Sequence, residues 1–239
     1  MARDAKHNYV LVHGTNHGGW CWGRVADTLT GNGHRVYAPS LTGCGDRVHL
    51  LTADTSLDTH IADIVNIILW QELTDVILCG HSYGGWVVSG VVEQVPDRIR
   101  SIVYLDAFMP NDGQRGLDLQ SPGSVEGVLR AQERGELSRP PGNLDRYRIN
   151  QKDRPWVESM LTPQPIGVSL QPIKLTGARD RVPQKVFIRA TEYDHPHFGS
   201  YYEKLSQHPD WQVFALPCGH DVMIDMPDEL SSILLGLVD

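Results

Sequence analysis

The chain has 239 residues, of which 41% are hydrophobic and 21% charged, and its formal net charge is −8. This composition is that of an ordinary globular protein, long enough for one large domain with a substantial core. The acidic balance and the lack of any run of three Lys or Arg exclude a basic face for nucleic acid or for an anionic membrane.

The first apolar stretch, YVLV at residues 9–12, is too short for the core of a signal peptide. No apolar run approaches the length of a membrane span. The four cysteines follow no zinc-binding spacing. Because no export signal is recognised either, we expect them to be reduced thiols. We therefore expect a cytoplasmic protein without a membrane partner.

Strand and helix patterns alternate along the first part of the chain. The predicted order is a strand at 8–14, a helix at 19–33, a strand and loop at 34–43, a helix at 56–73, a strand at 74–80, a helix at 86–97 and a strand at 100–108. Such alternation predicts a parallel sheet with helices on both faces. Ligands of these sheets bind at the carboxyl ends of the strands.

The alternation breaks at residues 109–183, which contain nine prolines and two short helical patterns, around 125–134 and 156–161. A segment of this length without strand signals is better explained as an inserted lid than as a loop. We predict a mostly helical lid at 109–183 within a core formed by 1–108 and 184–239. The later part of the core has predicted strands at 185–191 and 211–217 and predicted helices at 198–208 and 227–239.

The sequence GHSYG at residues 80–84 is a G-x-S-x-G motif between a predicted strand and a predicted helix. A chance Gly/Ser turn is the alternative, but this context favours Ser82 as a nucleophile on a tight turn. A serine hydroxyl needs a base to take its proton. Of the eleven histidines, His220 is the candidate, because it follows the last predicted strand at the tip of the sheet that faces Ser82.

A serine nucleophile also needs two hydrogen-bond donors for the oxyanion of its tetrahedral intermediate. The first is the backbone N–H of Tyr83, directly after the nucleophile. The second comes from the HGTN loop after the first strand, where Thr15 is the candidate. These residues are the predicted oxyanion hole.

Four stretches, VLVHGTNHGGWCW, GHSYGG, YLDAFMP and CGHDVM, resemble the α/β-hydrolase superfamily. They are most similar to the small bacterial esterases related to plant methylesterases and hydroxynitrile lyases. The resemblance spans both halves of the chain and leaves out residues 109–183. It implies an α/β-hydrolase fold with a mostly parallel sheet of about six strands, a Ser–His–acid triad, no cofactor, and hydrolysis of small, often aromatic esters.

Two carboxylates compete for the role of the triad acid. In most of the superfamily the acid follows the seventh strand, where Asp194 lies, although plant methylesterases have their aspartate where this chain has Tyr193. Asp106 ends the apolar run SIVYL, as the acid of pancreatic-type lipases does. Burying a carboxylate at the end of a strand costs free energy unless a positively charged or hydrogen-bonding partner lies beside it. We favour Asp106, with a turn-capping role as its alternative, and keep Asp194 as the alternative acid.

The resemblance implies a serine esterase acting on a small, aromatic or apolar carboxylic ester, and carbamates, lactones and thioesters use the same machinery. The candidates for the substrate pocket, with core packing as the alternative for most of them, are Asn16, Trp20, Phe108, Met109 and Trp156. We expect a small-molecule ester as the partner, with no nucleic acid, no metal and no other cofactor. The sequence does not decide whether the chain forms a homodimer.

Two other functions occur on the same scaffold. Hydroxynitrile lyases of the rubber-tree type have a threonine and a lysine where this chain has Gly14 and Asp221, and an acid beside the base disfavours a cyanide anion. The other alternative is a ligand-binding receptor whose triad turns over its ligand only slowly. A burst of product without steady turnover would favour the receptor.

Overall fold

The computed structural model describes residues 6–238, so the two ends of the predicted core, 1–5 and 239, lie outside the described residues. Six parallel strands form the central sheet in the order β2-β1-β3-β4-β7-β8. They are β1 (Asn8–Val12), β2 (Arg35–Tyr37), β3 (Val76–His81), β4 (Ile99–Leu105), β7 (Gln184–Ala190) and β8 (Trp211–Leu216). The predicted parallel sheet is confirmed.

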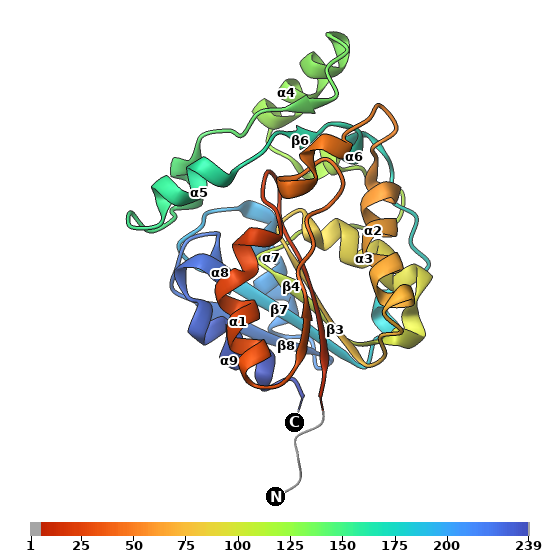
Figure 1. Cartoon of the computed structure of the whole chain (residues 1–239), viewed down its shortest axis with the longest axis vertical. Helices are drawn as coiled ribbons and strands as arrows, with labels where there is room; N and C mark the ends of the chain where they lie inside the picture. The colour runs from red at the N-terminus through yellow and green to blue at the C-terminus, as the bar shows by residue number, and fades with distance from the viewer. Residues whose placement is uncertain (1–5, 239) are drawn as a thin grey trace, which may run out of the picture.

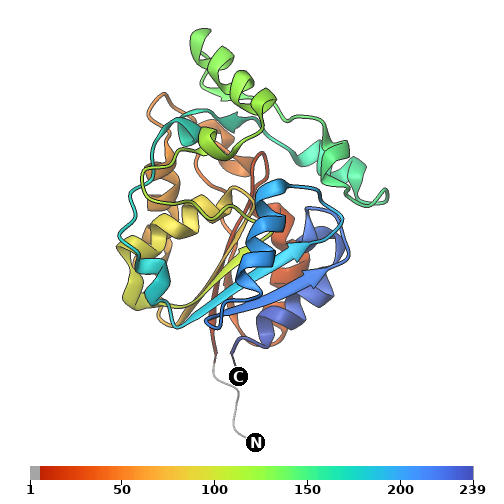
Figure 2. The ribbon, with the colours of Figure 1, turned by 180° about the vertical axis from the view of Figure 1, so that it is seen from behind.

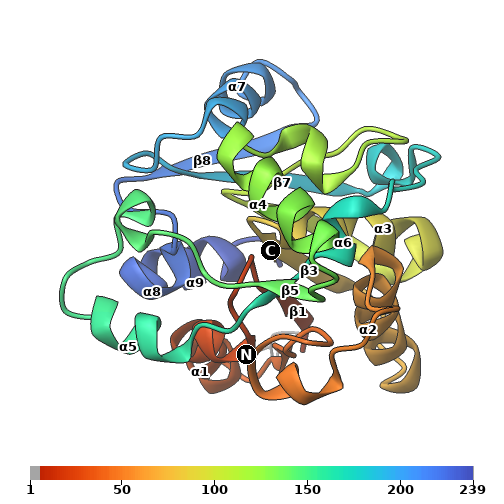
Figure 3. The same ribbon diagram turned by 90° about the horizontal axis from the view of Figure 1, so that it is seen from above.

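Helices cover both faces of this sheet (Figures 1 and 3). One face carries α1 (Gly23–Gly31) and α9 (Pro227–Leu235), and the other carries α2 (Leu57–Trp70), α3 (Gly84–Gln94) and α7 (Pro196–Leu205). The helix predicted at 19–33 begins as a separate 3-10 turn at Gly19–Trp22. Among residues 6–238, no helix combines the length and the apolar character that crossing a bilayer requires.

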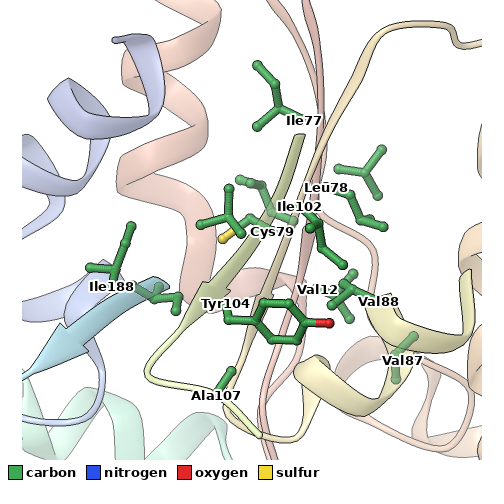
Figure 4. Close-up of a cluster of buried hydrophobic side chains, with 14 of the residues drawn as sticks. Val12, Ile77, Leu78, Cys79, Val87, Val88, Ile102, Tyr104, Ala107 and Ile188 are labelled. Carbon is green, nitrogen blue, oxygen red and sulfur yellow. The ribbon is translucent and has the colours of Figure 1, made fainter. Parts of the chain in front are cut away.

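The core lies on both sides of the central strands, where Ile77, Leu78, Ile102 and Ile188 are fully buried (Figure 4). Because both faces of the sheet are covered, these strands are nearly continuous apolar runs without alternation. Burial of each large aliphatic side chain contributes about 1.5–3 kcal/mol, so the strands are held firmly in register. Their carboxyl ends therefore form a rigid platform for the loops above them.

Most of residues 109–183 lies over the carboxyl ends of the strands, and the end of this segment runs down to the amino end of β7 (Figures 1 and 2). Both ends of the described chain lie at the side of the molecule opposite the carboxyl ends. Helices α4 (Pro122–Glu133) and α5 (Arg154–Met160) match the helical patterns predicted around 125–134 and 156–161. The segment also contains a small antiparallel sheet, which the sequence did not indicate because each strand has only two residues and shows no alternation. The elements are α4 (Pro122–Glu133), β5 (Ser138–Arg139), α5 (Arg154–Met160), β6 (Gln164–Pro165) and α6 (Gly167–Leu170).

Candidate active site

Ser82 lies on the turn from β3 to α3, and its φ angle of 53° is in the left-handed region. This conformation is costly for a residue with a side chain, so the surroundings must hold it. The N–H of Ser82 donates to the carbonyl of Leu105 at 3.2 Å, and its carbonyl accepts from the N–H groups of Gly85 and Phe108, each at 3.1 Å. The turn is thus tied to both β4 and α3.

Glycines on both sides of Ser82 allow the turn to be this tight. A Cβ at Gly80 would stand 2.6 Å from the carbonyl oxygen of Gly84. A Cβ at Gly84 would stand 2.7 Å from the carbonyl oxygen of Val12. Because neither position has room for a side chain, the helix can begin directly against the sheet and present the serine at its carboxyl edge.

His220 joins Ser82 to Asp106 through two hydrogen bonds. Its Nε2 is 2.9 Å from Oγ of Ser82, and its Nδ1 is 2.7 Å from Oδ2 of Asp106. The exposed fractions of Ser82, His220 and Asp106 are 7%, 3% and 0%. Since an ionised carboxylate only accepts, the proton of the neutral imidazole lies on Nδ1, and the Nε2 lone pair faces the serine hydroxyl. The geometry is that of a serine, its base and an orienting acid.

Of the two competing carboxylates, Asp106 is the one that reaches the base. Its φ angle of 41° turns the chain out of β4, and its N–H donates to the carbonyl of Ile188 at 2.7 Å. Asp194 is exposed in the loop after β7. The aspartate at the end of SIVYL therefore lies against the imidazole that needs its charge.

Arg189 is a second partner of Asp106 and a cationic one, and the sequence-based prediction did not include it. Its Nη1 donates to Oδ1 of Asp106 at 2.5 Å, and the N–H of Ala190 donates to the same oxygen at 3.1 Å. The guanidinium also donates to the carbonyls of Ala190 and Tyr193. One carboxylate oxygen is thus fully engaged, which leaves the other to orient His220.

The strand register explains this pair. Leu105 of β4 lies opposite Ile188 of β7, so Asp106 and Arg189 are neighbours at the ends of adjacent strands. Arg189 interrupts the buried apolar run VFI in the same way that Asp106 ends SIVYL. Two opposite charges ending two buried strands were the signal that could have revealed this pair.

Thr15 and Tyr83 are the residues predicted to form the oxyanion hole. Both residues line the pocket that contains Ser82 and His220. Within residues 6–238, neither N–H meets a hydrogen-bond acceptor. Both N–H groups are thus free to donate to a ligand, and their role as an oxyanion hole stays a prediction.

Asn16 fixes the loop that carries Thr15. Its backbone has a φ angle of 65°, and it exchanges three hydrogen bonds with the segment above. Its N–H donates to Oε1 of Gln164 at 2.8 Å, its Nδ2 donates to the carbonyl of Thr162 at 2.8 Å, and its carbonyl accepts from the N–H of Thr162 at 2.9 Å. Residues 162–164 thus hold the predicted oxyanion loop in place.

A second buried polar cluster lies behind His220, centred on Asp221. Oδ2 of Asp221 is 3.1 Å from Nε2 of His17, and Nδ1 of His17 is 2.8 Å from the carbonyl oxygen of Thr15. Both ring nitrogens of His17 face acceptors, so the imidazolium form satisfies both. His81 adjoins the cluster, with Nε2 2.9 Å from the carbonyl oxygen of His220. The cluster connects the Thr15 loop to the His220 loop.

The charges in this cluster shift each other's pKa. Burial opposes protonation of His17, but the carboxylate of Asp221 outweighs it, so the pKa of His17 is raised. Burial alone would raise the pKa of Asp221, but the charge and hydrogen bond of His17 reverse this and hold it well below its usual range. Burial and the neighbouring His220 lower the pKa of His81. We therefore assign a charged His17–Asp221 pair beside a neutral His81.

The pocket above Ser82 has a cavity of about 100 Å³ and a more polar wall than the sequence predicted. Of the five predicted pocket residues, Asn16 and Phe108 line it. Residues 109–183 contribute side chains that the sequence did not single out. These are Gln120, Ser121, Ser124, Arg139, Arg146 and Tyr147.

The other three predicted pocket residues, Trp20, Met109 and Trp156, do not line this pocket. The ring of Trp20 stacks on His17 at 5.3 Å and meets Trp156 edge-on at 5.1 Å. Trp156 lies on α5, which an ion pair between Arg24 and Asp153 ties to α1, so its ring packs outside the cavity. Met109 packs against the core. Large apolar side chains near the motifs were therefore a poor guide to the pocket.

Comparison with known proteins identifies the family. The model of the alpha/beta hydrolase family matches residues 9–233, so the chain belongs to this family. A carbendazim hydrolyzing esterase of Nocardioides sp. (strain SG-4G) is 39% identical over 96% of this chain and 99% of its own length. The putative methylesterase 14, chloroplastic, of Arabidopsis thaliana is 29% identical over 72% of this chain and 54% of its own length.

A solved structure shows the same fold. The extracellular alpha/beta-hydrolase from a Paenibacillus species superimposes with a TM-score of 0.83 at 23% identity, covering 97% of this chain and 98% of its own. The predicted α/β-hydrolase fold is thus confirmed. The predicted resemblance to bacterial esterases and plant methylesterases is confirmed by the relatives.

Proposed function

We propose that this chain, a carboxylic ester hydrolase of the α/β hydrolase family, cleaves a small ester through an acyl-enzyme on Ser82. The observation that supports the mechanism is the hydrogen-bonded series from Asp106 through His220 to Ser82, which opens into a pocket. The similarity to a carbendazim hydrolyzing esterase extends over nearly the whole chain and supports the reaction class.

In the first half of the reaction, Oγ of Ser82 attacks the ester carbonyl while Nε2 of His220 takes its proton. The carbonyl oxygen becomes an oxyanion that accepts hydrogen bonds from the N–H groups of Thr15 and Tyr83. Each such donor is worth about 2.7–4 kcal/mol in transition-state energy. The intermediate then collapses, and His220 gives its proton to the departing alcohol, which leaves an ester on Ser82.

In the second half, a water molecule attacks this ester while His220 takes a proton from it. The second tetrahedral intermediate uses the same two N–H groups, and its collapse returns the proton to Oγ of Ser82. Asp106 stabilises the imidazolium that forms in each half. Arg189 and the N–H of Ala190 hold the carboxylate in the orientation that this task requires.

Residues 109–183 form the lid of this site in our proposal. They supply eight lining residues, and some of their contacts with the core lie at the catalytic loops. The carbonyl of Tyr147 accepts a hydrogen bond from the N–H of His220 at 2.8 Å. Gln164 and Thr162 hold the loop of Asn16. A lid with these contacts can set the choice of substrate and also support the reacting groups.

The proposed substrates are small carboxylic esters and related carbamates, because carbendazim, on which the bacterial relative acts, is a methyl carbamate. A cavity of about 100 Å³ favours a compact acyl group. We also propose a cytoplasmic location, because all four cysteines are buried free thiols.

Ser82→Ala tests the mechanism. We expect ester turnover to fall by about 10⁶-fold, as when a catalytic serine is removed, and covalent labelling by a fluorophosphonate to disappear. Aryl methyl esters, p-nitrophenyl esters and carbendazim form the substrate panel. Labelling or steady turnover that persists in the alanine variant would contradict the proposal. A single burst without steady turnover would indicate a receptor.

A further inference from the structure

The wall of the catalytic pocket has an unbalanced positive charge. Arg139 and Arg146 line it, and no Asp or Glu does. The whole chain has a formal net charge of −8, so a cationic pocket is the opposite of its average surface. A local charge of this sign raises the concentration of anions at the pocket and accelerates their arrival.

Arg139 has no counter-ion among the described residues. It is half-buried, and within residues 6–238 its guanidinium meets no carboxylate and no hydrogen-bond acceptor. Burial lowers its pKa, and the charge of Arg146 lowers it further. A guanidinium stays protonated in proteins, so a partly desolvated positive charge lies in the wall without a partner, which is unfavourable until an anion meets it.

Several other arginines of the same segment are paired, whereas Arg139 is half-buried in the pocket wall without a salt bridge among the described residues. Salt bridges to neighbouring Asp or Glu side chains engage Arg115, Arg130, Arg134 and Arg154. Arg146 has no such bridge within the described residues, and its guanidinium lies 5.9 Å from the ring centroid of Tyr147. The paired Asp and Glu side chains of this segment thus lie on its outer surface, and no acidic side chain of the described residues lines the pocket.

The remaining groups of the wall add no negative charge. Burial lowers the pKa of His195 to about 3, so this imidazole is neutral at pH 7. Burial raises the pKa of Tyr193 to about 12 and also raises that of Tyr147, so both phenols keep their protons and can donate. Ser121 and Ser124 come from the first turn of α4, whose N-terminus is its positive end.

Arg139 is also held close to the reaction centre. It belongs to β5 and pairs with Gln164 of β6, whose Oε1 accepts the N–H of Asn16 in the oxyanion loop. Figure 3, looking onto the carboxyl ends of the strands, shows β5 and α4 above β3 and β1. The backbone of Arg139 is therefore anchored to the segment that holds the oxyanion loop, and its side chain lines the same pocket as Ser82.

We propose that the substrate is an ester that also carries a carboxylate, such as the monoester of a dicarboxylic acid, and that Arg139 and Arg146 bind this carboxylate. The proposal rests on the proposed function, because it places the ester carbonyl at Ser82. Planar guanidinium forks match carboxylates in geometry as well as in charge. A neutral diester fills the same space but leaves both guanidinium groups without a counter-ion.

Matched pairs of substrates test the proposal. Monomethyl and dimethyl esters of phthalic, isophthalic, terephthalic, succinic, glutaric and adipic acids are compared by kcat/KM. For at least one acid we expect the monoester to exceed its diester by about tenfold or more, the value of one charge-assisted hydrogen bond. The preference should shrink with added salt.

Two variants localise the effect. Arg139→Gln and Arg146→Gln should each lower the monoester-to-diester ratio by about tenfold, because each removes a charged donor. Arg130→Gln is the matched control, because Arg130 is exposed on α4 and paired with Glu126. It should leave the ratio unchanged. If Arg139→Gln misfolds, Arg139→Lys, which keeps the charge without the fork, should retain part of the preference.

Binding of the free diacids separates failure of this proposal from failure of the esterase mechanism. Calorimetry should detect at least one diacid bound by the wild type and by Arg130→Gln, with weaker binding by Arg139→Gln. Diesters cleaved as well as monoesters, with no diacid bound, would overturn the proposal while leaving Ser82 as a nucleophile. Diacid binding that depends on Arg139 without ester turnover would support the anion site and contradict the esterase mechanism.

Discussion

The six-stranded core and residues 109–183 meet at the same pocket, yet they contribute different kinds of groups to it. In the proposed mechanism, the core supplies the reacting side chains from strand ends and turns that the packed sheet holds in place. The upper segment supplies polar and cationic lining residues from short helices and two-residue strands. The core thus provides the chemistry of the proposed mechanism, and the segment provides the polar and cationic wall of the pocket.

Exchange of the triad acid is the sharpest test of the core. Asp106→Asn keeps the shape of the side chain but favours the wrong imidazole tautomer, so we expect turnover to fall by about 10⁴-fold. Asp194→Asn, an exposed change, should leave kcat/KM within about twofold. Steady-state kinetics of the two variants decides between the acids. A large loss in Asp194→Asn with activity retained in Asp106→Asn would reverse the assignment.

The sequence predicted the core better than the upper segment for a physical reason. GHSYG and SIVYLD mark strand ends, and the packing of a parallel sheet determines where those ends lie. Asp106 could be inferred because a buried charge needs a partner, whereas Arg189 required the register between β4 and β7. Arg139 and Arg146 lie in a segment without periodicity, so only the folded chain shows that they line the same pocket as Ser82.

The buried ion pair of His17 and Asp221 tests how firmly the core holds its two catalytic loops together. Asp221→Asn leaves His17 buried without its partner, and we expect a loss of about 3–5 kcal/mol in the free energy of unfolding near pH 6. The exposed Asp210→Asn is the control. Urea unfolding measures both.

The pH dependence of this loss has a definite sign. The raised pKa of His17 contributes stability that is fully present below about pH 6.5 and is lost as the pH rises through the folded value. The lowered pKa of Asp221 contributes stability that is lost only in strong acid. The cost of Asp221→Asn should therefore be larger at pH 6 than at pH 9. An equal cost at both pH values would contradict a charged His17.

Gln164 tests whether the upper segment supports the chemistry. Gln164→Leu leaves the buried N–H of Asn16 without its acceptor, at a cost of about 1–3 kcal/mol. The loop of Thr15 should shift, and kcat should fall by about tenfold. Gln171→Leu is the matched control, because it removes another hydrogen bond from this segment to the core, at the N–H of Asp58. Equal effects of the two variants would show that the segment acts only through stability.

Trp156 should show the smallest effect, although its large aromatic ring was a sequence-based candidate for the pocket. The ring is 37% exposed and packs edge-on against Trp20 outside the cavity. Trp156→Ala should cost about 0.5–1.5 kcal/mol of stability from the lost ring contact and leave kcat/KM within about twofold. Phe108→Ala, which alters the pocket wall itself, should raise KM. If Trp156→Ala changes substrate preference as Phe108→Ala does, then α5 contacts the substrate. The residues that select the substrate would then include α5 as well as Arg139 and Arg146.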